Sequence, residues 1–140
     1  MKKIVSHSAE ELQKIGQRLA KQLRGGDVLA LTGPLGAGKT TLTKGIAAGL
    51  GIKQIVNSPT FLLMKTYPIP GKNMSLIHVD CYRIGKAAEL TDIGLTELLG
   101  RADTITVIEW PEKIKKLLPR QKKLITIELQ QNDSRIITFL

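Results

Sequence analysis

The sequence predicts a three-layer α/β fold, in which helices cover both faces of a mixed, mainly parallel sheet with a C-terminal antiparallel hairpin. Three observations support this prediction. An apolar run, a glycine-rich turn and a stretch of helically spaced apolar residues follow one another, in the order strand, loop, helix. Two later apolar runs end in carboxylates, at Asp80 and Glu109. The last two apolar runs flank a polar turn, as in a hairpin.

The first 26 residues predict a short edge strand and an amphipathic helix. The strand lies at residues 4–5. Ser8 and Glu11 have the spacing of a capping box, in which the serine caps the helix and the glutamate reaches back. Gly25-Gly26 ends the helix. Its apolar stripe, which we expect to pack on the core, consists of Leu12, Ile15, Leu19 and Leu23.

Residues 33–40 read GPLGAGKT and match G-x-x-x-x-G-K-[ST], the phosphate-binding P-loop, at every fixed position. Glycines lack a Cβ, so the backbone can adopt left-handed angles and bring its N–H groups close to phosphate oxygens. Lys39 supplies a positive charge for the β- and γ-phosphates. Thr40 supplies a hydroxyl oxygen of the kind that Mg²⁺ binds. This motif predicts a P-loop NTPase fold.

The segments around the P-loop have the required pattern. Residues 28–31 are an apolar run that predicts a buried strand. Apolar residues at helical spacing reach Leu50, and Gly51 is suited to the helix end. Pro59 stiffens the turn that follows and thereby fixes Thr60. A strand over residues 62–67 and a loop over residues 68–73 then predict a hairpin.

Two strands are expected to deliver carboxylates to the P-loop. The strand at residues 76–80 ends in Asp80, which can organise Mg²⁺ directly or through water. The strand at residues 104–109 brings Glu109 to the same carboxyl edge of the sheet, where ligands bind in open α/β folds. Trp110 follows at once, and it either packs in the core or lies near the nucleotide or a partner.

For three side chains near these strand ends, a purely structural role is expected or is one of the alternatives. We expect a structural role for His78 and a small buried apolar role for Cys81. Arg83 either reaches a phosphate or a carboxylate, or forms a buried structural ion pair. Short helices are predicted near residues 89–90, 95–99 and 114–118, and the terminal hairpin pairs residues 124–129 with residues 135–140.

Length and composition favour a single domain over residues 1–140. No apolar run approaches the roughly 20 residues that span a bilayer, and the N-terminus lacks the apolar region of a secretory signal. Cys81 is the only cysteine, which excludes an internal disulfide and favours the reducing cytoplasm. We therefore expect a cytoplasmic protein without membrane contact.

The chain is basic, with a formal net charge of +9. Six of its cations lie between residues 113 and 123. They form either a solvated face or a surface that meets RNA or a partner. The aromatic content of 4% is too low for a stand-alone binder of single-stranded RNA, which stacks bases on aromatic rings.

Five motifs in this order resemble the TsaE family, small P-loop ATPases of bacterial tRNA threonylcarbamoyladenosine biosynthesis. The matching segments are GPLGAGKTT from residue 33, SPTF from residue 58, HVDCYR from residue 78, Glu89 with Gly94-Leu95, and EWP from residue 109. Two positions depart from the common form: Pro34 replaces an acidic residue and Cys81 a larger apolar one. Neither is a fixed P-loop position.

The resemblance implies ATP and Mg²⁺ as ligands, slow ATP hydrolysis, and action on a partner pair of TsaB and TsaD homologues, with tRNA met only through that complex. Glu109 would activate the attacking water, with Asp80 and Lys39 also in catalytic roles. Thr40, Asp80 and Glu109 would serve the Mg²⁺ site. The nucleotide would be held by Gly33, Leu35, Gly36, Ala37, Gly38, Lys39, Thr40 and Thr41, with Thr60 as a switch residue and Trp110 close by.

Other function classes remain open at this point. A small-molecule kinase needs an acceptor-binding subdomain, for which 140 residues leave no obvious room. A GTPase needs a guanine-reading N/T-K-x-D segment, which the sequence lacks. A nucleotide-responsive scaffold without significant turnover would lack the water-activating carboxylate, whereas Glu109 is available here.

Overall fold

The computed structural model describes residues 2–59 and 63–140, which form one seven-stranded sheet in the order β1-β7-β6-β2-β5-β4-β3. The four central strands, β6, β2, β5 and β4, are parallel. Antiparallel strands complete both sides, with β3 on one edge and β7 and β1 on the other. The strands are β1 Lys2–Ser6, β2 Val28–Thr32, β3 Met64–Pro68, β4 Ser75–Asp80, β5 Thr104–Glu109, β6 Lys123–Leu129 and β7 Arg135–Phe139.

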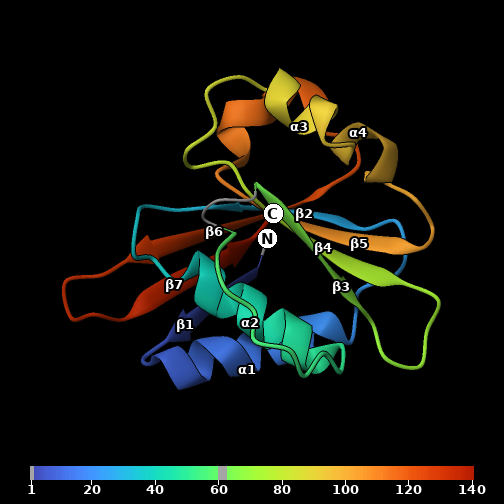
Figure 1. Cartoon of the computed structure of the whole chain (residues 1–140). Coiled ribbons are helices and arrows are strands. Elements are labelled where there is room, and N and C mark those ends of the chain that lie inside the picture. Colours follow the sequence, from blue (N-terminus) through green and yellow to red (C-terminus); the bar gives the residue numbers. More distant parts are fainter. Residues whose placement is uncertain (1, 60–62) are drawn as a thin grey trace.

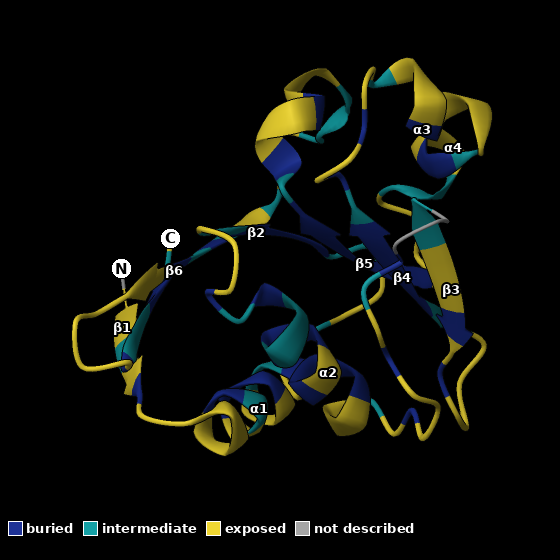
Figure 2. Ribbon diagram, turned by 60° about the vertical axis from the view of Figure 1, so that its left-hand side comes forward, coloured by how far each residue is buried: buried dark blue, intermediate teal, exposed yellow. Residues whose placement is uncertain are grey.

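Helices cover both faces of this sheet, so the predicted three-layer α/β architecture is confirmed (Figure 1). One face carries α1 (Ala9–Ala20) and α2 (Lys39–Gly49). The other carries α3 (Ala88–Asp92), α4 (Leu95–Leu98) and the 3₁₀ helix η1 (Pro111–Leu117). The central strands consist mostly of buried residues (Figure 2). Along β5, for example, Val107 belongs to the core under α1 and α2, and Ile108 to the core under α3 and α4.

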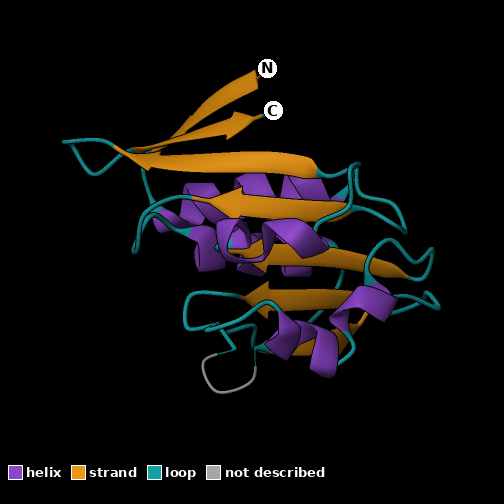
Figure 3. Ribbon diagram, turned by 90° about the horizontal axis from the view of Figure 1, so that it is seen from above, coloured by secondary structure: helices purple, strands orange, loops and turns teal. Residues whose placement is uncertain are grey.

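The parallel register decides where the functional groups lie. All six residues of β5 are buried, as expected for a strand covered on both faces. Glu109 at its end pairs in register with Asp80 of β4 on one side and with Leu31 of β2 on the other. The ends of three neighbouring strands therefore meet at the start of the P-loop. Both chain termini lie toward the β1–β7 edge (Figure 3).

The predicted N-terminal elements are present, with one correction. Ser8 Oγ accepts a hydrogen bond from the N–H of Glu11 at 3.1 Å, and the Glu11 carboxylate accepts from the N–H of His7 at 2.7 Å. The prediction that the helix continues to Leu23 is wrong, because α1 ends at Ala20. Its last turn tightens into i→i−3 bonds, such as that from the N–H of Leu23 to the carbonyl of Ala20 at 3.2 Å.

Further differences concern boundaries rather than elements. The predicted β-hairpin is present, but β3 extends to Pro68, which was expected in the loop. A proline is tolerated there because β3 is an edge strand. The expected start of this strand at Leu62 lies outside the described residues. The helix predicted near residues 114–118 is a 3₁₀ helix that opens with Pro111 and is kinked at Ile114.

Helices α1 and α2 pack with their backbones in contact, and this makes the fold sensitive at two glycines. A Cβ at Gly45 would lie 2.2 Å from the carbonyl oxygen of Gln13, and one at Gly16 would lie 2.5 Å from that of Leu42. We expect Gly45→Ala to lower the free energy of unfolding by about 1–3 kcal/mol, although alanine favours helices. Urea denaturation measures this change.

The matched control is Gly85→Ala. A Cβ at Gly85 would meet only the flexible Glu89 carboxylate, at 3.3 Å, so the same substitution should change the unfolding free energy little. Unchanged or increased stability of Gly45→Ala would show that the two helices can move apart at no cost.

Candidate functional site

A cavity of about 580 Å³ opens at the carboxyl edge of the parallel strands. It is bounded by the P-loop, the start of α2, residues 58–59, and the ends of β4 and β5. Its lining comprises Leu35, Gly36, Ala37, Gly38, Lys39, Thr40, Thr41, Ser58, Pro59, Leu63, Asp80, Tyr82, Arg83, Glu109 and Trp110. Nearly all of the predicted site residues are thus gathered in one place. Gly33 contributes only its carbonyl oxygen, and Thr60 lies outside the described residues.

The glycines of the P-loop have the backbone angles for which glycine is needed. Gly36 has a φ of 81° and Gly38 a φ of 109°, both in the left-handed region. Gly38 is also the N-cap of α2 and provides no side-chain cap. The first N–H groups of the helix therefore have no capping side chain, and the residues that carry them line the cavity, as in sites that bind anions at helix N-termini.

Lys39 folds back onto its own loop. Its Nζ donates to the carbonyl of Gly33 and, at 3.3 Å, to that of Pro34. The same Nζ lies 3.7 Å from the centroid of the Trp110 ring, within cation–π distance. Burial lowers the pKa of the Lys39 amine, and the nearby carboxylates of Glu109, Glu112 and Asp80 oppose this shift. A buried cation held by neutral carbonyls and a ring is suited to receive an anionic ligand.

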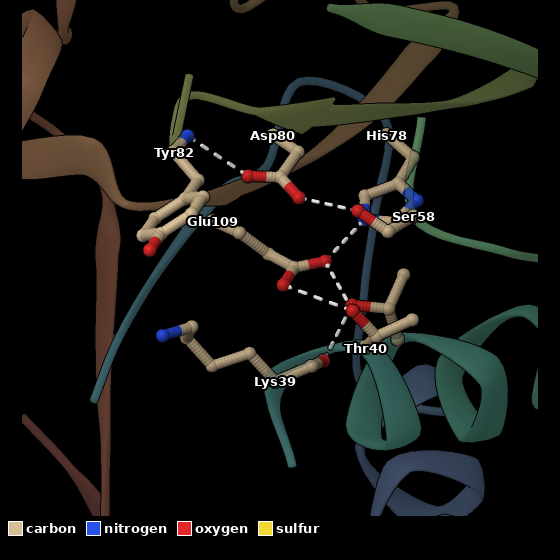
Figure 4. Close-up of polar contacts among 8 residues, drawn as sticks. Lys39, Thr40, Ser58, His78, Asp80, Tyr82 and Glu109 are labelled. Atoms are coloured by element: carbon tan, nitrogen blue, oxygen red, sulfur yellow. Dashed lines mark hydrogen bonds and ion pairs between the residues drawn. The ribbon is translucent and has the colours of Figure 1, made fainter. Parts of the chain in front are cut away.

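Glu109 is the centre of the polar contacts in the site (Figure 4). Its two oxygens accept from the Thr40 hydroxyl at 3.0 and 3.1 Å. Oε2 also lies 2.6 Å from Nε2 of His78, which is fully buried. His78 is therefore buried, as expected for a structural residue. The group that it contacts is the Glu109 carboxylate, which belongs to the site. The carboxylate is itself only 3% exposed and is fixed from two sides.

Asp80 is held by two other donors (Figure 4). Its Oδ2 accepts from the Ser58 hydroxyl, and its Oδ1 accepts from the N–H of Tyr82 at 2.9 Å. Ser58 was not predicted as a site residue, although its place before Pro59 fixes its backbone. Among the described residues, no group of three or more His, Cys, Asp and Glu side chains is arranged to hold a metal. The oxygens available to a cation here are those of Thr40, Asp80 and Glu109.

Trp110 packs on the core, as one of the two interpretations expects, and it also lines the cavity. It is partly buried against the core under α3 and α4, and its ring faces Lys39. Its centroid lies 5.1 Å from that of Tyr82, with the two rings tilted by 43°. Its backbone is left-handed, with a φ of 59°, which is unusual for a bulky residue. Such a conformation persists only where the surroundings hold it, as they do directly after Glu109.

Several surrounding residues can now be assigned. The interpretation of Arg83 as a buried structural ion pair is wrong, because Arg83 is exposed and lines the cavity. Cys81 is buried as expected, and burial raises the pKa of its thiol to about 12. In the basic segment, Lys113 donates to the carbonyl of Tyr82 and Lys122 to that of Pro119.

Among the described residues, no helix has both the length and the apolar character needed to cross a membrane.

Comparison with known proteins assigns this chain to a family. The family model of Threonylcarbamoyl adenosine biosynthesis protein TsaE matches residues 6–137. The tRNA threonylcarbamoyladenosine biosynthesis proteins TsaE of Streptomyces coelicolor and Bacillus subtilis are 44% and 43% identical over 115 and 130 residues. These matches cover 81% and 93% of this chain, and 76% and 79% of the relatives.

A solved structure agrees with these sequence matches. The crystal structure of YdiB from Bacillus subtilis aligns with a TM-score of 0.82 at 37% identity. The alignment covers 99% of this chain and 83% of that one. Fold, site and sequence therefore lead to one conclusion: the chain belongs to the TsaE family of tRNA threonylcarbamoyladenosine biosynthesis proteins.

Proposed function

We propose that this protein binds and slowly hydrolyses ATP, and that it is required for threonylcarbamoyladenosine modification of tRNA through action on a TsaB–TsaD complex. The observation that carries the proposal is the convergence of Lys39, Thr40 and Glu109 on one cavity at the start of α2. A cation, a hydroxyl and a buried carboxylate in this arrangement are the groups that phosphoryl transfer requires.

The phosphates are bound by the P-loop in this proposal. The backbone N–H groups at the start of α2 and the helix dipole favour an anion at this position. Lys39 exchanges its contacts with the carbonyls of Gly33 and Pro34 for the β- and γ-phosphates. Trp110 stays close enough to Lys39 to sense this exchange. The absence of an N/T-K-x-D segment favours adenine over guanine nucleotides.

The donor set of the cavity fits Mg²⁺. Hydroxyl and carboxylate oxygens are hard ligands, and a cation that is bound together with phosphates needs few ligands from the protein. Thr40, Asp80 and Glu109 would hold it, directly or through water. When bound, the ion would neutralise charge on the phosphates.

Glu109 orients and activates the attacking water in the proposed reaction. The hydrogen bonds from Thr40 and His78 fix its carboxylate beside the P-loop, so it is positioned before ATP binds. A fixed carboxylate can accept the proton of a water molecule as that water attacks the γ-phosphate. The availability of this group favours an ATPase over a scaffold without turnover.

The family supports our proposals on the partner and the location. The printed names of the relatives place them in tRNA threonylcarbamoyladenosine biosynthesis. We propose that TsaB and TsaD homologues are the partners, that tRNA is met through their complex, and that the protein works in the cytoplasm.

Co-purification tests the partner proposal. We expect the tagged protein to form a complex with the TsaB and TsaD homologues of its own organism, and ATP to change the amount of complex at least about threefold, since nucleotide affinity and partner affinity are linked. Size-exclusion chromatography with and without ATP measures this. The Lys39→Ala variant is the control, because its complex should no longer respond to ATP. Absence of association in both conditions would contradict the proposed partners.

A further inference from the structure

The side chain of Arg135 contacts backbone carbonyls of the P-loop and is not among the residues that line the cavity. Arg135 is the first residue of β7, and it follows the P-loop by about 100 residues in the sequence. Its Nε donates to the carbonyl of Ala37 at 2.8 Å, and its Nη2 lies 3.3 Å from the carbonyl of Gly36. Its third group, Nη1, donates to the carbonyl of Asp133 at 2.8 Å. One guanidinium thus joins the β6–β7 turn to the P-loop.

The turn orients this guanidinium before it reaches the loop. Asp133 has a left-handed φ of 64°, a conformation that Asp tolerates better than most residues. The Asn132 side chain accepts from both the N–H and the hydroxyl of Ser134, at 3.1 and 2.6 Å. The backbone around Arg135 is therefore held by its own contacts. The fork of the guanidinium is rigid and always charged, so its direction is well defined.

The contact determines which way the P-loop peptides face. In a planar trans peptide the C=O and the following N–H point in opposite directions. Since Arg135 holds the carbonyls of Gly36 and Ala37 on one side, the N–H groups of Ala37 and Gly38 point to the other. The N–H of Ala37 is already used within the loop, because it donates to the carbonyl of Pro34 at 3.0 Å. The peptide whose N–H can be presented to a ligand is therefore that between Ala37 and Gly38, whose carbonyl accepts from Arg135 Nε at 2.8 Å.

The packing around Gly38 supports the same conclusion. A Cβ at Gly38 would lie 2.4 Å from the Leu12 side chain and 3.6 Å from Arg135 Nε. The loop is therefore pressed against α1 and Arg135, and it cannot move back on that side. We propose that Arg135 is a positioning residue for nucleotide binding: it holds the Ala37–Gly38 peptide so that the N–H of Gly38 faces the phosphates. This inference rests on the proposed ATP binding.

The test compares Arg135→Gln and Arg135→Lys with the unaltered protein. Calorimetric titration with ATP and with ADP measures affinity, and steady-state hydrolysis gives kcat and KM. We expect Arg135→Gln to weaken both nucleotides roughly tenfold, the size of effect that a lost charge-assisted hydrogen bond produces. KM should rise more than kcat falls, because the residue acts on binding. Arg135→Lys keeps the charge without the fork, so it should recover part of the affinity.

Controls separate this role from a general loss of stability. Arg120→Gln removes an equal charge from an exposed position and should leave affinity unchanged. Thermal unfolding without nucleotide shows whether Arg135→Gln remains folded, and affinity is compared at a temperature at which it does. Equal ATP affinity of Arg135→Gln and the unaltered protein would overturn the inference. Failure of the unaltered protein to bind ATP would instead overturn the proposed function.

Discussion

Replacing Lys39 with alanine is expected to weaken ATP binding at least about 100-fold, which amounts to its loss at ordinary concentrations. Lys39 is only 5% exposed, and its amine is held at the P-loop by two carbonyls and the Trp110 ring. Its loss removes the cation that the P-loop itself supplies to the phosphates and leaves, within the loop, only backbone N–H groups and the helix dipole. Calorimetric titration with ATP measures the change.

Trp110 provides a second measurement of the same event. It is the only tryptophan in the sequence, and its ring lies 3.7 Å from Lys39 Nζ. Movement of Lys39 toward a phosphate should therefore change its fluorescence in the unaltered protein and not in Lys39→Ala.

Lys44→Ala is the matched control for this variant. Lys44 is an exposed residue of the same helix, so its removal changes the net charge equally and should leave affinity unchanged. Thermal unfolding of both variants shows whether they fold. ATP affinity that survives in a folded Lys39→Ala protein would refute the assignment of this loop as the nucleotide site.

The sequence was sufficient for those parts of the site that depend on local spacing. The P-loop is one continuous segment, and its glycines, Lys39 and Thr40 have fixed positions within it. The positions of Asp80 and Glu109 could also be predicted, because each residue ends an apolar run and parallel strands share a carboxyl edge. The order of the central strands then determined that these two carboxylates lie in register.

The role of His78 could be predicted from the sequence only in part, because it depends on the register of two strands. Alternation along a strand places His78 on the same face as Asp80. Which group it meets depends on the pairing of β4 with β5, which sets Asp80 beside Glu109. This pairing joins segments about 30 residues apart and has no local sequence signal. A structural role therefore remained the simpler expectation for a lone histidine in an apolar strand.

Arg135 could not be predicted at all. Its contact with the P-loop requires β6 to lie beside β2 and β7 to follow β6 in the sheet. A sequence pattern indicates a terminal hairpin but does not indicate which side of the central sheet it joins. The contact also uses backbone carbonyls of Gly36 and Ala37, so no complementary side chain marks it.

Glu109→Gln is expected to retain ATP binding within about threefold and to lower the rate of hydrolysis by about 10²–10⁴-fold, the range that a lost general base produces. The amide has nearly the same shape and can still accept from Thr40, but it cannot take a proton from water. Single-turnover hydrolysis, with ATP affinity measured in parallel, separates the two effects. Glu112→Gln is the matched control, because Glu112 also acts electrostatically on Lys39 yet lies outside the cavity lining.

The comparison of these two variants isolates the chemistry of Glu109. Both remove one negative charge near Lys39, so any effect of charge on ATP affinity should appear in both. Only Glu109 accepts from Thr40 and contacts His78 at the strand end beside the P-loop, and a loss of turnover confined to Glu109→Gln would therefore reflect its position. Equal hydrolysis by the two variants would remove Glu109 from the reaction and would favour a nucleotide-responsive scaffold, in which these hydrogen bonds serve only to hold β5 against α2.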